Sequence, residues 1–170
     1  MRIVVTVDGQ EKATRAFRVV DESLRDWRGV WPEIQGYLLR ASAEQFDSIG
    51  SRGGQQWRPL SPRYAKWKEL NYPGQPILVR TGALRESLTR SGANGNVANF
   101  QPLFAEYGTS IRYAKFHQRG TRRMPARPPF APTARDIDRI VSRLFRYSEE
   151  VAKGAGFETR SRARRTPGAE

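Results

Sequence analysis

The 170-residue chain has no cysteine and one histidine, which excludes disulfide bonds, thiolate catalysis, cysteine-bound metals and any intrachain site built from two histidines. No stretch reaches the roughly 18 apolar residues of a membrane span, and no secretory leader pattern opens the chain, so we expect no membrane partner. The formal net charge is +13, and residues 51–130 alone hold fourteen basic and three acidic side chains. This basic stretch favours nucleic acid, an acidic protein surface or a phosphate-rich polymer as partner, with a solubilising surface as the alternative.

The N-terminal part of the chain predicts a short strand followed by two helices. Residues 2–7 (RIVVTV) are rich in β-branched side chains, which is typical of a strand. Asp8 and Glu11 have the spacing of a capping box, and apolar residues at helical spacing follow them. A second helix is expected from Pro32, whose missing N–H costs nothing in a first turn, to just before Gly50.

Shorter elements are expected in the middle of the chain. Ser61 precedes a proline and starts a short helix that ends at a proline- and glycine-containing turn. Thr81 caps the next helix, in which Leu84 and the leucine one turn later face inward. A glycine-rich loop at 91–96 then leads into a β region at about 97–107.

The C-terminal part predicts one helical turn, an extended segment and a long helix. The turn covers residues 113–118, and prolines make residues 124–130 an extended, stiff arm. A long helix opens at Pro132-Thr133. Helical spacing places Ile137, Ile140, Val141, Leu144 and Val151 on one face of it.

These elements together predict the α+β class, with a small and mostly antiparallel sheet packed with N-terminal helices and a long C-terminal helix. We expect residues 1–156 to form a single domain. Residues 157–170 are expected to be a basic, disordered tail.

Motifs for catalysis are nearly absent. A Ser–His–Asp triad would need His117, and no nucleophile elbow accompanies any serine, so His117 is interpreted as a polar residue on a partly buried turn. The pairs Asp136/Asp138 and Glu149/Glu150 lie on the amphipathic C-terminal helix, where a solvated face is favoured over an acid–base pair. We therefore expect no enzymatic activity, no cofactor and no metal.

Residues 113–130 (YAKFHQRGTRRMPARPPF) and the preceding arginine combine positive charge with aromatic rings and prolines. The candidates for contact with a partner are Arg112, Lys115, Arg119, Arg122, Arg123, Arg127 and Phe130. These cations suit DNA phosphates, with the aromatic rings as stacking surfaces, and they equally suit carboxylates of a neighbouring subunit. Sequence-specific recognition is not expected, because no helix-turn-helix, zinc finger or RNP-type signature is present. A third interpretation is an assembly module, since proline arms and amphipathic terminal helices suit subunit contacts.

Five motifs follow one another in a specific order: QF (45–46), WRPLS (57–61), LVRTGAL (78–84), YAKFHQRG (113–120) and PARP (125–128). This succession, over about residues 30–150, resembles the phage virion-morphogenesis family, which includes Mu G-like and tail-completion S-like proteins of tailed bacteriophages. The proline arm departs from the family pattern by reading Arg-Pro-Pro-Phe in place of Arg-Pro-Phe.

The resemblance implies a structural protein of the phage head–tail neck, of the tail-completion or connector kind, assembled in the bacterial cytoplasm and located in the virion. It implies a homo-oligomeric ring, sixfold or twelvefold, around the DNA channel. The implied partners are portal or connector proteins, tail proteins and double-stranded DNA in the lumen. The alternative is a nonspecific DNA-binding protein that uses the basic aromatic segment.

The same motifs contain the residues expected to hold the structure together: Trp57, Leu60, Thr81, Gly82, Leu84, Tyr113, His117 and Gly120. Trp57 is expected in the core, and Tyr113 and His117 are expected to dock the short turn against the sheet. The prolines of the arm lower the entropy lost on ordering, which suits packing on an adjacent subunit. Arg127 is expected to cross that boundary as a bidentate fork to a carboxylate.

Overall fold

The computed structural model describes residues 10–155 as an α+β arrangement, which confirms the predicted fold class. Its elements are, in chain order, α1 (Gln10–Leu24), α2 (Trp31–Asp47), the 3₁₀ helix η1 (Ser51–Gly53), α3 (Pro62–Asn71), α4 (Ala83–Thr89), β1 (Asn96–Phe100), β2 (Ala105–Thr109), α5 (Ala114–Arg119) and α6 (Ala134–Gly154). The strand expected at residues 2–7 and the tail expected at 157–170 lie outside the described residues. Within 10–155, no helix combines the length and the apolar character that crossing a bilayer requires.

Three of the predicted helix starts are confirmed and one is wrong. Pro32 lies in the first turn of α2, the Ser61 hydroxyl caps α3, and the Thr133 side chain caps α6. Helix α4, however, begins after Gly82 and not at Thr81, and no side chain caps it. The reason is backbone geometry: Gly82 has a φ of 84°, a left-handed conformation that glycine adopts at little cost, and this moves the first helical residue past the threonine.

The sheet is a single antiparallel hairpin of β1 and β2, five residues long on each side. Its turn is fixed to the helices by two tryptophans. The Nε1–H of Trp31 donates to the carbonyl of Gln101 (2.8 Å), and the backbone N–H of Trp27 donates to the carbonyl of Pro102 (2.8 Å). These bonds hold the hairpin turn in place although it lies at the surface.

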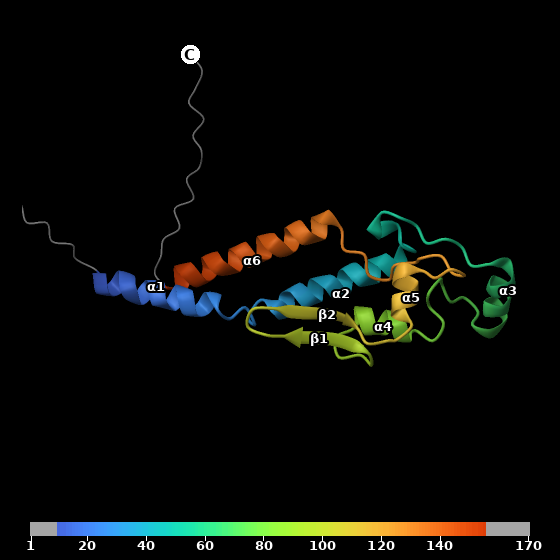
Figure 1. Cartoon of the computed structure of the whole chain (residues 1–170), viewed down its shortest axis with the longest axis horizontal. Coiled ribbons are helices and arrows are strands. Elements are labelled where there is room, and N and C mark those ends of the chain that lie inside the picture. The colour runs from blue at the N-terminus through green and yellow to red at the C-terminus, as the bar shows by residue number, and fades with distance from the viewer. Residues whose placement is uncertain (1–9, 156–170) are drawn as a thin grey trace, which may run out of the picture.

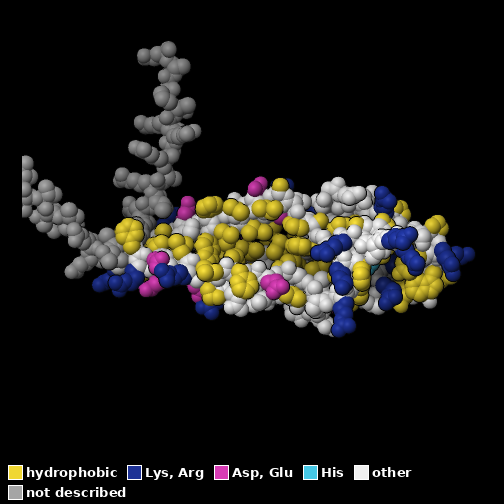
Figure 2. All heavy atoms as spheres, in the orientation of Figure 1, with side chains coloured by type: hydrophobic (Ala, Val, Ile, Leu, Met, Phe, Trp, Pro, Cys, Tyr) yellow, Lys and Arg dark blue, Asp and Glu magenta, His cyan; other side chains and the backbone are white. Residues whose placement is uncertain are grey.

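The elements form an elongated molecule with α1 at one end and α3 at the other (Figure 1). Helix α6 is joined to α2 by Arg143, whose Nε donates to Glu33 (2.7 Å), and Trp27 packs on Tyr147 near its C-terminal end. Figure 2 shows apolar side chains gathered over α6 and the hairpin, and lysines and arginines gathered toward the end that holds α3 and α5. On the face shown, the largest apolar patch and most of the lysines and arginines thus lie apart, although α3 and α5 also expose apolar side chains.

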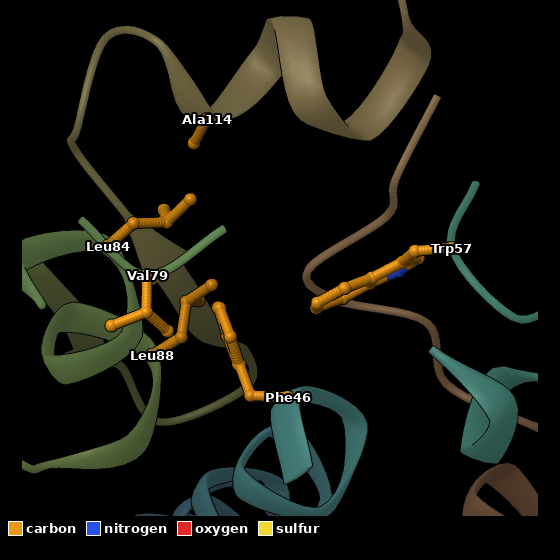
Figure 3. Close-up of a cluster of buried hydrophobic side chains, with 6 residues drawn as sticks. All are labelled: Phe46, Trp57, Val79, Leu84, Leu88 and Ala114. Carbon is orange, nitrogen blue, oxygen red and sulfur yellow. The ribbon is translucent and has the colours of Figure 1, made fainter. Parts of the chain in front are cut away.

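The hydrophobic core lies where α2, α4, α5 and the loop after η1 meet (Figure 3); its buried members are Phe46, Trp57, Val79, Leu84, Leu88 and Ala114. The Trp57 side chain is 3% exposed and meets the Phe46 ring edge-on, with 5.5 Å between ring centroids. A Cβ atom on Gly50 would lie 2.4 Å from Cδ1 of Trp57, so only glycine leaves room for the indole at that turn. The core therefore sits beside the segment that the sequence singled out.

Candidate functional site

Residues 113–130 fold into α5 followed by a closed loop. The loop is held at its base by the backbone N–H of Arg127, which donates to the carbonyl of His117 (2.8 Å). Gly120, at the end of α5, has a φ of 73°, and a Cβ atom there would lie 2.7 Å from the backbone nitrogen of Ala126. This turn therefore requires glycine.

The proline part of this segment packs on the core of its own chain. The carbonyl of Pro128 accepts hydrogen bonds from Nε1 of Trp57 (3.1 Å) and from Nε2 of Gln45 (3.0 Å). The half-buried Phe130 ring packs against Tyr107, with 5.5 Å between centroids. The arm predicted from the prolines is thus a fixed part of the fold and is not free to extend toward an adjacent subunit. The physical reason is that two buried side-chain donors need the carbonyl that this segment supplies.

Arg127 is buried, which overturns the expectation of a fork to a carboxylate on a neighbouring subunit. The side chain is 5% exposed; its Nε donates to the carbonyl of Arg58 (2.7 Å) and its Nη2 to the carbonyl of Pro59 (2.8 Å). Burial lowers the pKa of the guanidinium. Arg127 therefore ties the WRPLS motif to the proline segment within one chain.

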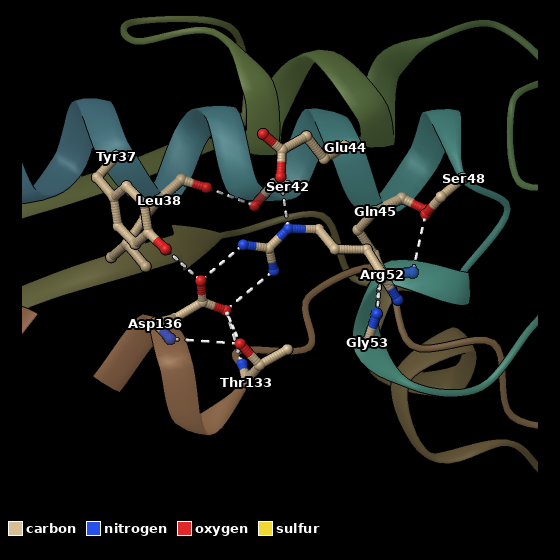
Figure 4. Close-up of polar contacts among 10 residues, drawn as sticks. All are labelled: Tyr37, Leu38, Ser42, Glu44, Gln45, Ser48, Arg52, Gly53, Thr133 and Asp136. Carbon is tan, nitrogen blue, oxygen red and sulfur yellow. Dashed lines mark hydrogen bonds and ion pairs between the residues drawn. The ribbon is translucent and has the colours of Figure 1, made fainter. Parts of the chain in front are cut away.

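A second buried polar cluster joins α2, η1 and α6 (Figure 4). Asp136 is 1% exposed and accepts from Nη2 of Arg52 (2.6 Å), from Nη1 of the same side chain (2.9 Å), from the Tyr37 hydroxyl and from Thr133. The expectation of a solvated carboxylate at Asp136 is therefore wrong, whereas Asp138 is exposed. The capping-box spacing of Thr133 and Asp136 is the sequence signal that could have indicated this difference.

The charges in this cluster stabilise one another. The hydrogen bonds from Arg52 hold the pKa of the Asp136 carboxyl well below its usual range, with smaller contributions from Tyr37 and Thr133. The pKa of Arg52 is raised by the same pairing, and burial raises the pKa of Tyr37. The cluster therefore acts as an ionised structural clamp between α6 and the rest of the fold.

A cavity of about 490 Å³ opens between α3, α4 and α5. Four of the five sequence motifs meet in its wall. Three of them contribute Leu60, Thr81, Gly82, Leu84, Tyr113 and His117. Arg123 and Arg127 from the proline segment complete that side of the wall. The structure thus brings together six of the eight residues that the sequence expected to be structural, but only two of the seven expected to contact a partner.

Lys68 also lines this cavity, and the sequence did not single it out. It is 5% exposed, and its Nζ donates to the carbonyls of Gln75 (2.5 Å) and Pro76 (2.6 Å). Burial lowers its pKa, and the charge of Glu69 offsets this in part. In the part of the chain that the structure describes, neither Lys68 nor Arg127 forms an ion pair with a carboxylate.

The end of the molecule around α3 and α5 is strongly basic (Figure 2). Several exposed cations there form no ion pair within residues 10–155: Arg63, Lys66, Arg112, Lys115, Arg119, Arg122 and Arg123. Their charges are therefore available to an anionic partner. No three His, Asp or Glu side chains of the described chain gather closely enough to hold a metal ion.

An apolar face lies on the other part of the molecule, over α6 and the hairpin (Figure 2). We define it by its exposed large side chains Leu103, Phe104, Ile137, Val141 and Phe145. Leu103 is 69% exposed and Phe145 is 67% exposed. Ile137 and Val141 are exposed whereas Ile140, Leu144 and Val151 are half-buried, so the fold covers only part of the apolar face of α6.

Comparison with known proteins gives the family. Residues 8–149 match the phage virion morphogenesis family. The chain belongs to this family. It is also 28% identical over 129 residues to the Mu-like prophage FluMu G protein 1 of Haemophilus influenzae, an alignment that covers 75% of this chain and 84% of that protein. No solved structure matches the chain. The protein thus takes part in phage virion morphogenesis.

The structure of this family member separates the predicted partner contacts into two groups. Arg112, Lys115, Arg119, Arg122 and Arg123 are exposed, whereas Arg127 is buried and Phe130 is half-buried. Tyr113 is exposed but meets the His117 ring edge-on, with 5.9 Å between centroids. The exposed cations are therefore the ones left for a partner.

The sequence missed three features: the buried Lys68, the Arg52–Asp136 clamp and the exposed turn of the hairpin. Lys68 lies in a short basic helix whose apolar and polar residues are hardly separated onto two faces, so nothing in the pattern marks Lys68 as buried. Leu103 and Phe104 follow a proline in a predicted β region, where alternation assigns one of any two adjacent residues to the inside. Leu103 and Phe104 are both exposed because they lie in the hairpin turn, where the alternation of a strand does not apply.

Proposed function

We propose that this protein is a structural component of the phage head–tail neck, of the tail-completion or connector kind, that forms a homo-oligomeric ring around the DNA channel. In this role it is located in the virion, uses no cofactor and has no catalytic activity. Portal or connector proteins and tail proteins are its neighbours. A sixfold or a twelvefold ring is equally compatible with one chain.

The observation that carries the proposal is the apolar face. A soluble monomer exposes single apolar residues at many places, but contiguous large ones mark surfaces that are covered in an assembly. Here α6 exposes Val141 and Phe145, one helical turn apart, and the hairpin turn exposes Leu103 and Phe104. Figure 2 shows apolar side chains gathered over these elements. The turn is fixed by Trp27 and Trp31, so the face is already ordered before a partner binds.

The position of the apolar face also supports contact between copies around an axis. The face lies on one part of an elongated molecule and the basic end on another (Figure 2). Two different surfaces on one chain allow head-to-tail contacts, and such contacts close into rings when the rotation between copies permits.

Charged substitutions on the apolar face should prevent assembly without unfolding the protein. We expect the double variant Val141→Asp with Phe145→Asp to keep its thermal unfolding temperature, because both side chains are exposed. Burying the new carboxylates should weaken a subunit contact by about 2 kcal/mol or more, roughly 30-fold in affinity. The measurement is complementation of a phage that lacks its own copy of the gene, with immunoblotting of purified particles for the variant.

The matched control is Ser142→Asp with Arg135→Gln, which changes the net charge equally on the polar side of α6. This control should enter particles normally. Normal incorporation of the Val141→Asp/Phe145→Asp variant would show that the apolar face is not an assembly surface.

Nonspecific DNA binding is a second candidate function, favoured by the unpaired exposed cations of the basic end. If these cations contact phosphates, the logarithm of the affinity should fall linearly with the logarithm of the salt concentration, by about 0.9 per phosphate contact. Arg119→Gln with Arg122→Gln should reduce that slope by about 2. Arg135→Gln with Arg146→Gln on α6 is the equal-charge control and should leave the slope unchanged. Fluorescence anisotropy with a labelled DNA duplex measures the salt dependence of the affinity for each variant. An affinity that does not depend on salt would exclude this function.

A further inference from the structure

The cavity between α3, α4 and α5 is a site separate from the apolar face, since the described residues that line it come from outside α6. Its volume of about 490 Å³ falls within the range of cavities that hold ligands. Much of its wall is aliphatic, formed by Leu60, Leu78, Val79, Leu84 and Met124. Such a wall suits a large apolar side chain, which gains by leaving water.

The charge of the wall has one sign. Lys68, Arg80, Arg123 and Arg127 line the cavity, and no Asp or Glu of the described chain does. Lys68 and Arg127 are buried, and their hydrogen bonds within residues 10–155 go to carbonyl oxygens, so no carboxylate of that range neutralises them in place. Because buried charges interact more strongly than exposed ones, a carboxylate entering this cavity is attracted more than one at the surface.

His117 adds a polar atom without a partner. Its ring lines the cavity, and its Nδ1 is buried and makes no hydrogen bond to any residue in 10–155. Buried polar atoms are nearly always paired, so an unpaired one calls for a partner from outside residues 10–155. Burial and the charge of Arg127 both lower the pKa of the imidazole.

We propose that this cavity binds an extended segment of a second virion protein, in which one large apolar side chain is flanked by acidic residues. The apolar side chain enters between the aliphatic residues, and the flanking carboxylates pair with the exposed Arg80 and Arg123. That the segment comes from a virion protein rests on the proposed function; the binding chemistry of the cavity does not.

Two other occupants fit the wall less well. Duplex DNA is convex and presents phosphates without apolar side chains, so it leaves the aliphatic wall uncovered. The chain's own residues 157–170 carry four arginines and two glutamates, so they share the sign of the cavity. Charge and apolarity together therefore favour an acidic segment of another protein.

The test is a titration of the full-length ¹⁵N-labelled protein with short synthetic peptides, followed by NMR. The probe is acetyl-Gly-Glu-Leu-Glu-Gly-amide, compared with the peptides that carry glutamine or lysine in place of both glutamates. We expect shifts of the His117 ring signals and of the amides of the cavity wall for the glutamate peptide, with a Kd of the order of 1 mM because so few groups bind. The chain has one histidine, so the ring signals are assigned without ambiguity. The lysine peptide should not bind.

Two variants locate the binding. Arg80→Gln with Arg123→Gln should weaken binding of the glutamate peptide at least about fivefold, since it removes both exposed charge partners. Ala83→Trp should abolish it, because Ala83 is an exposed part of the lining and an indole there fills the mouth. Arg58→Gln is the control for a general loss of charge: its side chain is exposed at the same end and Arg58 is not among the lining residues. It should change the Kd less than twofold at about 0.15 M salt, where salt weakens the attraction between exposed charges.

Equal shifts with the glutamine peptide, or binding that survives Ala83→Trp, would overturn the proposal. A DNA duplex that shifts the same wall residues and is blocked by the same variants would assign the cavity to DNA instead. Because these experiments use synthetic peptides, failure here leaves the ring and neck proposal untouched, and failure of particle assembly does not affect the peptide result.

Discussion

Replacing Asp136 with alanine should lower the free energy of unfolding by about 3 kcal/mol, because removal of one partner leaves the other partner's charge largely buried without its counter-ion. The Asp136 carboxylate is the shared acceptor for Arg52, Tyr37 and Thr133, so its loss also removes the half of the α6 capping box in which the carboxylate accepts from the Thr133 backbone N–H (2.7 Å). Arg52 keeps a bond to the exposed Glu44 (2.8 Å), and we therefore expect the lower end of the range for a broken buried pair. The melting temperature should fall by roughly 6–12 °C.

The matched control is Asp138→Ala, two residues away on the exposed side of α6 and without an ion pair in the described chain. It should change the free energy of unfolding by less than about 0.5 kcal/mol. Equal losses for the two variants, in urea unfolding followed by circular dichroism, would mean that the Asp136 cluster does not stabilise the fold.

The same carboxyl should make stability depend on acid pH. Its pKa is lowered in the folded state, mainly by Arg52, so the unfolded chain binds the proton more tightly and stability rises with pH. The contribution is complete above about pH 5 and is lost progressively as pH falls below the unfolded value of about 3.9. Asp136→Asn cannot titrate, so its stability difference from the wild type should be constant from pH 7 to about pH 5 and should shrink below about pH 4. A difference that stays constant to about pH 3 would contradict the assigned pKa shift.

Trp57→Ala should lower the free energy of unfolding by about 3–5 kcal/mol, because it removes the largest side chain of the core and leaves a cavity against Phe46. It also removes one of two donors to the Pro128 carbonyl, through which the proline segment is fastened. Trp57→Phe should cost less, roughly 1–2 kcal/mol, since Gln45 still donates to that carbonyl and the ring refills part of the space. Urea unfolding of each variant, followed by circular dichroism, gives these values.

Trp67→Ala is the control for loss of an indole at the surface. Trp67 is 42% exposed and stacks on Tyr64, with 5.5 Å between ring centroids. Its removal should cost less than about 1.5 kcal/mol. A Trp57→Ala variant as stable as this control would show that the indole does not hold the proline segment on the core.

The sequence predicted the elements well where the signal is local. Pro32 at the start of α2, Ser61 before α3 and Thr133 before α6 act within one helical turn, so neighbouring residues suffice to locate the starts. The prediction that Thr81 caps α4 was wrong. Its neighbour Gly82 adopts a left-handed backbone conformation, and this conformation, rather than a side-chain cap, sets where the helix begins.

The sequence identified the cations of the candidate site, but it did not show which of them are exposed and which is buried. Arg112, Lys115, Arg119, Arg122 and Arg123 are exposed cations, as a basic loop suggests. Arg127 belongs to the same run of charge, but its environment is set by the carbonyls of Arg58 and Pro59, almost seventy residues earlier in the chain. No pattern within the motif distinguishes the buried arginine from the exposed ones.

Composition, helix signals and the order of five motifs were enough to determine the α+β class, the starts of α2, α3 and α6 and the virion morphogenesis family, because each depends on residues close together in the chain or on their order along it. Which charges are buried, which half of the α6 apolar surface is left uncovered, and which motifs share one cavity were decided only by the tertiary structure. The physical reason is that burial depends on what packs against a residue, and here those neighbours, such as Arg52 for Asp136, come from distant parts of the chain.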